Sequence, residues 1–189
     1  HDYFGNTDRE SGIAALNLII DNYNKGVKVT YQVYTPEEIE QNSSLGCVQL
    51  FYYPAETPGA KTAIVIPGNA LTITSEMGEG GSTAYELHKR GYAVFVLRYR
   101  TFLDLGDNAP LQDLARAVQL VTSLSEELSI QTQDYALVGY SSGGQLAGVF
   151  ANKERGYGHY GVARPGVLLL GYSVVNFSEV KIAYQALMD

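Results

Sequence analysis

Short apolar runs alternate with amphipathic segments along most of the chain. Between residues 8 and 24 the apolar side chains recur at helical spacing, and Thr7 and Glu10 have the spacing of a capping box, so a helix is predicted there. Alternating or uniformly apolar runs bounded by turn residues predict strands. These strands are expected at residues 27–35, 48–53, 63–66, 92–99, 135–138 and 167–175.

Helices are expected between the later strands. Three of them are expected at residues 83–90, in a segment opened by Asn108-Ala109-Pro110, and at residues 145–153. A glycine-rich loop is expected at 78–82, and a short last helix at 178–189. From residue 63 onward strands and helices therefore alternate, which predicts a mostly parallel sheet with helices on both faces. The first two strands, joined without a helix, fit an antiparallel edge. The pattern favours an α/β fold in a single domain.

Composition narrows the range of functions. With 189 residues, 46% of them hydrophobic and 17% charged, the chain fits one globular domain. A formal net charge of −7 without clustered Lys and Arg argues against nucleic acid as a partner. No stretch approaches the ~20 apolar residues of a membrane span, so no membrane association is expected. No signal peptide is visible in a chain that opens on His1, which slightly favours the cytoplasm and leaves the compartment open.

The single cysteine, Cys47, excludes an intrachain disulfide. It lies in a strand-like run, so we expect a small core residue rather than a reactive thiol. The sequence shows no cluster of His, Cys and carboxylates at metal-ligand spacing, and we expect neither a metal nor an organic cofactor.

Residues 139–143 read Gly-Tyr-Ser-Ser-Gly, a match to G-x-S-x-G between an apolar strand-like run and a helix-like run. Glycines at this spacing let the backbone turn sharply and let neighbouring chain pass close to it. The frame selects Ser141 over Ser142, because Ser141 has a glycine two residues before it and two after it. Ser141 is therefore a candidate nucleophile, and the alternative is a serine in an ordinary glycine-rich turn.

Around this motif the chain resembles the α/β-hydrolase superfamily, and within it the esterase and acetylesterase branch that includes proteins similar to acetyl xylan esterases. The segments that carry the resemblance are residues 63–68, 91–100, 110–118, 139–147 and 164–172. They look like the third strand with the start of its oxyanion loop, the fourth strand, a helix, the nucleophile elbow and the next strand.

The resemblance implies how the site would work. Ser141 would form an acyl-enzyme, and the backbone N–H of Ser142 would bind the oxyanion. A second donor would come from the loop Pro67-Gly68-Asn69-Ala70, by position the N–H of Gly68 or Asn69. Asn69 and Ala70 depart from the family's run of glycines. The alternative for this loop is an ordinary strand-end turn.

The acid and histidine of a catalytic triad are harder to place. Asp113 precedes the nucleophile and, as the resemblance supports, is expected to form a buried ion pair with the arginines Arg98 and Arg100. Only His159 follows Ser141, in a loop expected at the far end of the sheet, while His88 is expected at the surface. Like His159, Glu179 and Asp189 have weak claims to catalysis.

The family's acid and histidine follow two further strands, which are missing here, so both residues are expected beyond Asp189. Three explanations stay open: a partial chain, a sheet completed by a second chain or by another copy in a homo-oligomer, and a degenerate homologue. The sequence thus predicts an α/β-hydrolase fold and a serine carboxylesterase whose partner is a small-molecule ester, such as an acetylated sugar. The alternatives are a serine peptidase of the same superfamily and a catalytically inactive binding protein.

Overall fold

A computed structural model describes residues 9–68, 75–101 and 108–173. They form a six-stranded sheet with the strand order β1-β2-β4-β3-β5-β6. The strands are β1 (Thr30–Gln32), β2 (Gln49–Tyr53), β3 (Ala60–Ile66), β4 (Ala93–Arg98), β5 (Ile130–Tyr140) and β6 (Val167–Gly171). The helices are α1 (Arg9–Asn24), α2 (Pro36–Gln41), α3 (Ser82–His88), α4 (Ala109–Ser123) and α5 (Ser141–Phe150), with a 3₁₀ turn η1 (Ser43–Cys47) and a π-helical turn η2 (Glu76–Gly81).

The strand directions confirm a mostly parallel sheet with an antiparallel edge. β4, β3, β5 and β6 are mutually parallel, whereas β2 runs antiparallel to both β1 and β4. The prediction that β1 and β2 are joined without a helix is wrong, because α2 and η1 lie between them. Thr35 and Glu38 form a capping box in which the Glu38 N–H donates to Thr35 Oγ1 and the Thr35 N–H donates to Glu38 Oε2.

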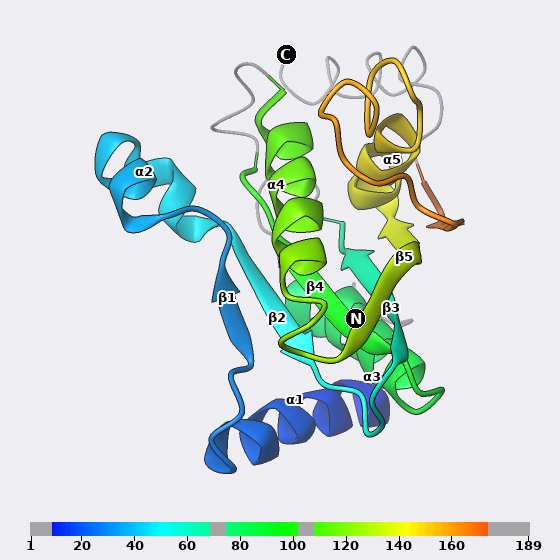
Figure 1. The fold of residues 1–189 in the computed structure, drawn as a ribbon. Coiled ribbons are helices and arrows are strands. Elements are labelled where there is room, and N and C mark those ends of the chain that lie inside the picture. The colour runs from blue at the N-terminus through cyan, green and yellow to red at the C-terminus, as the bar shows by residue number, and fades with distance from the viewer. Residues whose placement is uncertain (1–8, 69–74, 102–107, 174–189) are drawn as a thin grey trace, which may run out of the picture.

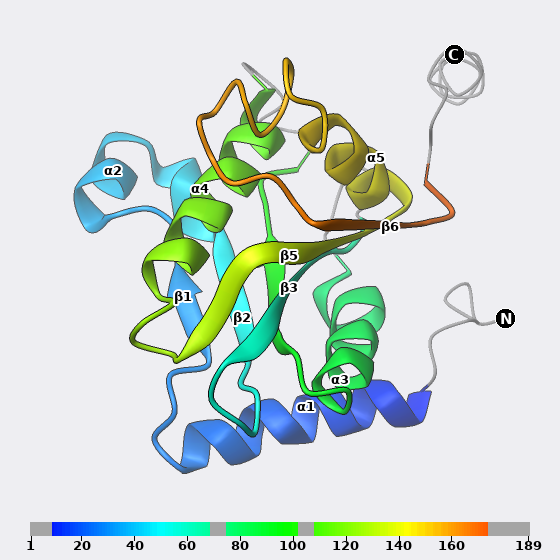
Figure 2. The ribbon, with the colours of Figure 1, turned by 45° about the vertical axis from the view of Figure 1, so that its right-hand side comes forward.

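Helices cover both faces of the sheet (Figures 1 and 2). Because side chains alternate along a strand, neighbouring residues of β4 belong to different cores. Phe95 and Leu97 pack with α4 and α5, whereas Val94 and Val96 pack with α1 and α3. All four β4 side chains are fully buried, as expected for a central strand with both faces covered.

The glycine-rich segment is not a loop. Residues 76–81 form η2, and Ser82 begins α3. A Cβ at Gly80 would lie 2.5 Å from Val96 Cγ1, and one at Gly81 would lie 3.4 Å from both Ala15 Cβ and the Tyr53 hydroxyl. The glycines therefore allow a helical turn to pack closely on the sheet.

Other boundaries also differ from the sequence prediction. β5 begins at Ile130 rather than residue 135, because its polar first part pairs with β3 before a register shift. Cys47 is exposed in η1, where its thiol donates to the Ser44 carbonyl, so the prediction of a core cysteine is wrong. The helix predicted at 178–189 and Thr7 of the first capping box lie outside the described residues.

Within the described residues, β6 is the outermost strand on its side of the sheet. Its apolar side chains, from Val167 to Leu170, are 37–49% exposed. The expectation that a further strand or a second chain covers this edge remains a prediction. None of the helices in the described part of the chain is long and apolar enough to cross a membrane.

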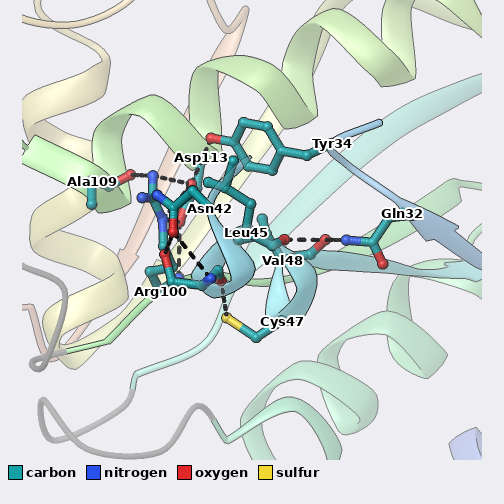
Figure 3. A network of polar contacts seen from close by, with 10 residues as sticks. Gln32, Tyr34, Asn42, Leu45, Cys47, Val48, Arg100, Ala109 and Asp113 are labelled. Carbon is teal, nitrogen blue, oxygen red and sulfur yellow. Dashed lines mark hydrogen bonds and ion pairs between the residues drawn. The ribbon is translucent and has the colours of Figure 1, made fainter. Parts of the chain in front are cut away.

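A buried polar network joins the end of β4 to α4 (Figure 3). Asp113 is fully buried on α4. Its carboxylate accepts hydrogen bonds from the backbone N–H of Arg100, from Nη2 of the Arg100 guanidinium at 2.7 Å and from the Tyr34 hydroxyl at 2.7 Å. The expected ion pair between Asp113 and an arginine is thus confirmed for Arg100. Arg98 instead pairs with Glu76 of η2 at 2.5 Å.

Candidate active site

The carboxyl ends of the four parallel strands meet at one edge of the sheet. Register places Ile66 of β3 opposite Gly139 of β5, and Tyr140 opposite Gly171 of β6. The helix after β3 covers one face, while the helix after its neighbour β5 covers the other (Figure 2). This arrangement is a topological switch point, the place where open α/β sheets bind their ligands.

Ser141 lies at this switch point, between β5 and α5. Its φ is +50°, a left-handed conformation that non-glycine residues rarely adopt. A Cβ at Gly139 would lie 2.6 Å from both the Gly143 carbonyl and Gly144 Cα. A Cβ at Gly143 would lie 2.3 Å from the Ile66 carbonyl. The glycines of the motif are therefore required by close backbone approaches.

The segment after β3 packs directly on this turn. The Tyr99 hydroxyl donates to the Pro67 carbonyl at 2.9 Å, and the Ser142 side chain also interacts with the Tyr99 phenol. Burial is the main cause that raises the pKa of Tyr99, which therefore stays a neutral hydrogen-bond donor beside the Ser141 turn. A Cβ at Gly68 would lie only 2.9 Å from Ser141 Cβ.

Both backbone segments predicted to bind an oxyanion thus lie beside Ser141. Ser142 is in the first turn of α5, where backbone N–H groups have no intrahelical partner. The Gly68 N–H, however, already donates to Glu79 Oε2 at 2.6 Å. Asn69, the other residue predicted from this loop, lies outside the described residues.

Glu79 also contacts the end of β6. Its Oε1 accepts a hydrogen bond from the hydroxyl of Tyr172, which directly follows that strand. Burial, together with the nearby Glu79 carboxylate, raises the pKa of Tyr172 and keeps it a donor. The Tyr172 ring lies 5.7 Å from the Tyr140 ring, and the Tyr140 hydroxyl accepts from Thr83 at 2.9 Å.

The structure places His88 and His159 at the opposite edge of the sheet. His88 ends α3, before β4 begins, and its side chain is only 10% exposed, so the prediction of a surface residue is wrong. His159 is an exposed residue whose ring contacts Tyr160, in the segment between the far end of α5 and β6. His1, Glu179 and Asp189 lie outside the described residues. No group of three potential metal ligands occurs among the residues that the structure describes.

Sequence reasoning missed Tyr99, Tyr172 and Glu79. The two tyrosines have a recognisable signal, since each closely follows a parallel strand and strand ends converge at the switch point. Glu79 has a weaker one: it is an acidic residue within the glycine-rich segment between a strand and a helix.

The fold and the site define the class of this protein as an α/β-hydrolase. An α/β hydrolase from a deep-sea metagenome library shares 25% sequence identity, with a TM-score of 0.60 over 68% of this chain and 53% of that chain. An acetyl ester-xyloside bifunctional hydrolase from Caldicellulosiruptor lactoaceticus shares the fold, with 23% identity and a TM-score of 0.65 over 79% of this chain and 58% of that chain.

The chain belongs to the BD-FAE family, whose model matches residues 49–158. An acetylxylan esterase from Xylanibacter ruminicola is 29% identical over 153 residues, which are 80% of this chain and 30% of that protein. This chain therefore spans under a third of that relative and little more than half of the two structures. The predicted resemblance to α/β-hydrolases of the acetyl xylan esterase type is confirmed.

Proposed function

We propose that this chain carries the nucleophile of a serine carboxylesterase and that its turn at residues 139–143 is the nucleophile elbow. The observation that supports this most strongly is Ser141 itself. Its left-handed backbone sits between a strand and a helix at the switch point, enclosed by glycines that tolerate no Cβ. Such a strained turn exposes a serine hydroxyl at the carboxyl edge of the sheet.

In this proposal Ser141 Oγ attacks the carbonyl carbon of an ester while a base accepts its proton. The tetrahedral oxyanion binds backbone N–H groups, collapses and expels the alcohol, which takes up the proton. Water then hydrolyses the acyl-enzyme and regenerates the serine. The N–H of Ser142 is one oxyanion donor. The Gly68 N–H already donates to a carboxylate, so we propose the backbone N–H of Asn69 as the second oxyanion donor. Gly68 instead allows the segment after β3 to pass close to Ser141.

The acid and the histidine of this reaction are proposed to lie outside the described residues, because His88 and His159 are both at the opposite edge of the sheet. The reaction needs no metal or organic cofactor, since the serine supplies the nucleophile and backbone dipoles stabilise the charge. The relatives named as acetylxylan esterase and acetyl ester-xyloside hydrolase support a short acyl ester of a sugar as the substrate.

A serine peptidase would use an acidic side chain near Ser141 to hold a substrate amine. Glu79 is such a side chain, but each of its carboxylate oxygens already accepts a hydrogen bond from the protein, one from Gly68 and one from Tyr172. This arrangement favours the esterase over the peptidase.

Labelling of the intact protein with a fluorophosphonate probe tests the proposal. We expect labelling that Ser141→Ala abolishes and that Ser142→Ala retains, because the latter keeps the backbone N–H that binds the oxyanion. p-Nitrophenyl acetate should be hydrolysed and aminoacyl anilides should not. An unlabelled intact protein would indicate an inactive binding protein, and anilide hydrolysis would indicate a peptidase.

A further inference from the structure

The carboxylate of Glu79 lies where three separate segments of the site meet. It is supplied by the π-helical turn η2, and its two oxygens accept hydrogen bonds from Gly68, two residues after the end of β3, and from Tyr172, the residue after the end of β6. Glu79 and Tyr172 are 93 positions apart in the sequence, so only the folded sheet brings them together. The side chain is half-buried beside Ser141, whereas its partner Tyr172 is 67% exposed.

The bond from Gly68 is well suited to holding a backbone segment. An anionic acceptor makes a hydrogen bond shorter and stronger than a neutral one, and the 2.6 Å separation between the Gly68 nitrogen and Glu79 Oε2 is short. A Cβ built on Gly68 would approach both Ser141 Cβ, at 2.9 Å, and Glu79 Oε2, at 3.0 Å. Gly68 is thus held between the carboxylate and the serine, so a displacement of its peptide changes the space around Ser141.

A second bond restrains the carboxylate itself. The Tyr172 hydroxyl donates to Oε1, and the Tyr172 ring packs against the ring of Tyr140, the residue before Ser141. Glu79 therefore cannot rotate freely without losing two hydrogen bonds. The same contacts connect the carboxyl ends of β3, β5 and β6, the three strands around Ser141.

We propose that Glu79 is a positioning residue for the reaction at Ser141: its carboxylate fixes the Gly68 peptide beside Ser141 in the geometry that stabilises the transition state. This inference rests on the proposed esterase function. A misplacement of about 1 Å in such a segment costs about 100-fold in rate, although the displaced group takes no part in the chemistry. The bond to Tyr172 holds the carboxylate in the orientation that Gly68 needs.

The test compares Glu79→Gln, Glu79→Ala and Tyr172→Phe in the intact protein, with Glu76→Gln as the matched control. Glu76 lies in the same turn, three residues earlier, but pairs with Arg98. Active sites are counted by fluorophosphonate labelling to completion, so that kcat is expressed per folded site. Glutamine keeps an oxygen for the Gly68 N–H and loses the charge, whereas alanine loses the acceptor altogether.

We expect kcat to fall about 10-fold in Glu79→Gln and about 100-fold in Glu79→Ala, at the lower end of the loss of about 100- to 1000-fold from removing an oxyanion donor outright, with KM changed by less than about threefold. Tyr172→Phe should lower kcat about threefold, and Glu76→Gln should leave it within about twofold. A purely structural role would lower the melting temperature and leave kcat per site unchanged.

Two results overturn the inference while the proposed function stands: labelled Glu79 variants with wild-type kcat, or an equal loss of kcat in Glu76→Gln. If the wild-type protein is not labelled at all, the proposed function fails and the inference fails with it. Because Glu79→Gln and Tyr172→Phe are nearly isosteric with the natural residues, the test does not depend on whether Glu79→Ala folds.

Discussion

Replacing Asp113 by alanine should lower the free energy of unfolding of this protein more than an ordinary surface substitution does. Asp113 is fully buried, and its carboxylate neutralises the guanidinium of Arg100, whose side chain is only 7% exposed. Alanine would leave the Arg100 charge buried without its carboxylate and would remove the acceptor of the Tyr34 hydroxyl. The cost is large because the buried guanidinium keeps its desolvation penalty but loses the attraction of the Asp113 carboxylate.

Breaking a buried ion pair by removing one partner costs about 3–5 kcal/mol of unfolding free energy. The network of Asp113 belongs in this range, because the side chain accepts from the backbone and guanidinium of Arg100 as well as from Tyr34. For a chain of this size, each kcal/mol lowers the melting temperature by about 2–4 °C. We therefore expect a fall of about 6–20 °C.

Urea denaturation of wild type and Asp113→Ala measures the loss directly, and the double variant Arg100→Met with Asp113→Ala completes a thermodynamic cycle. The double variant should be less destabilised than the sum of the two single variants, because methionine removes the buried charge that Asp113 neutralises. Asp113→Asn, which keeps one acceptor oxygen, should lie between wild type and alanine. A loss below about 1 kcal/mol in Asp113→Ala, the size of an ordinary substitution, would refute this account of the network.

Two further predictions concern the elbow glycines and a buried tyrosine. Gly143→Ala should destabilise the protein by about 1–3 kcal/mol or more and abolish fluorophosphonate labelling, because its Cβ would lie 2.3 Å from the Ile66 carbonyl. Gly148→Ala is the matched control in the same helix, where the nearest atom is 3.9 Å away; equal urea midpoints for the two variants would contradict the prediction. Burial raises the pKa of Tyr53 from 10.0 to about 12, so its contribution to stability is complete below pH 10 and is lost as the pH rises through about 12. Tyr53→Phe should therefore lose stability less steeply than wild type between pH 10 and 12 in urea titrations; parallel curves would show that Tyr53 does not titrate as its burial requires.

The parts of the fold predicted correctly are those with a local signature. Residues 63–66 of β3 and 93–97 of β4 are uniformly apolar because both faces of these strands are covered, and the turn at Ser141 is specified by glycines within two residues of it. α2 is not predicted because Pro36 is also typical of a turn, although Thr35 and Glu38 have the capping-box spacing.

The remaining errors come from packing between distant segments. The glycine-rich composition of residues 78–82 predicts a loop, but Gly80 is needed because Val96 lies where its side chain would be. Tyr172 and Glu79 were not predicted as site residues, because their meeting depends on the register of β6 against β5 and of β5 against β3. Arg98 was expected to join Asp113, but its partner Glu76 is in η2, which the sequence did not reveal.

The π-helical turn η2 makes the length of the segment before α3 as important as its sequence. Surface connections usually accept insertions and deletions. Here, removing one residue between Ser75 and Glu79 would restore α-helical spacing, and each residue of an α-helix turns the next by about 100° around the axis. Glu79 would then face away from Gly68 with its own identity unchanged. A single-residue deletion in this turn would thus remove the contact between Glu79 and Gly68, as a substitution of Glu79 would.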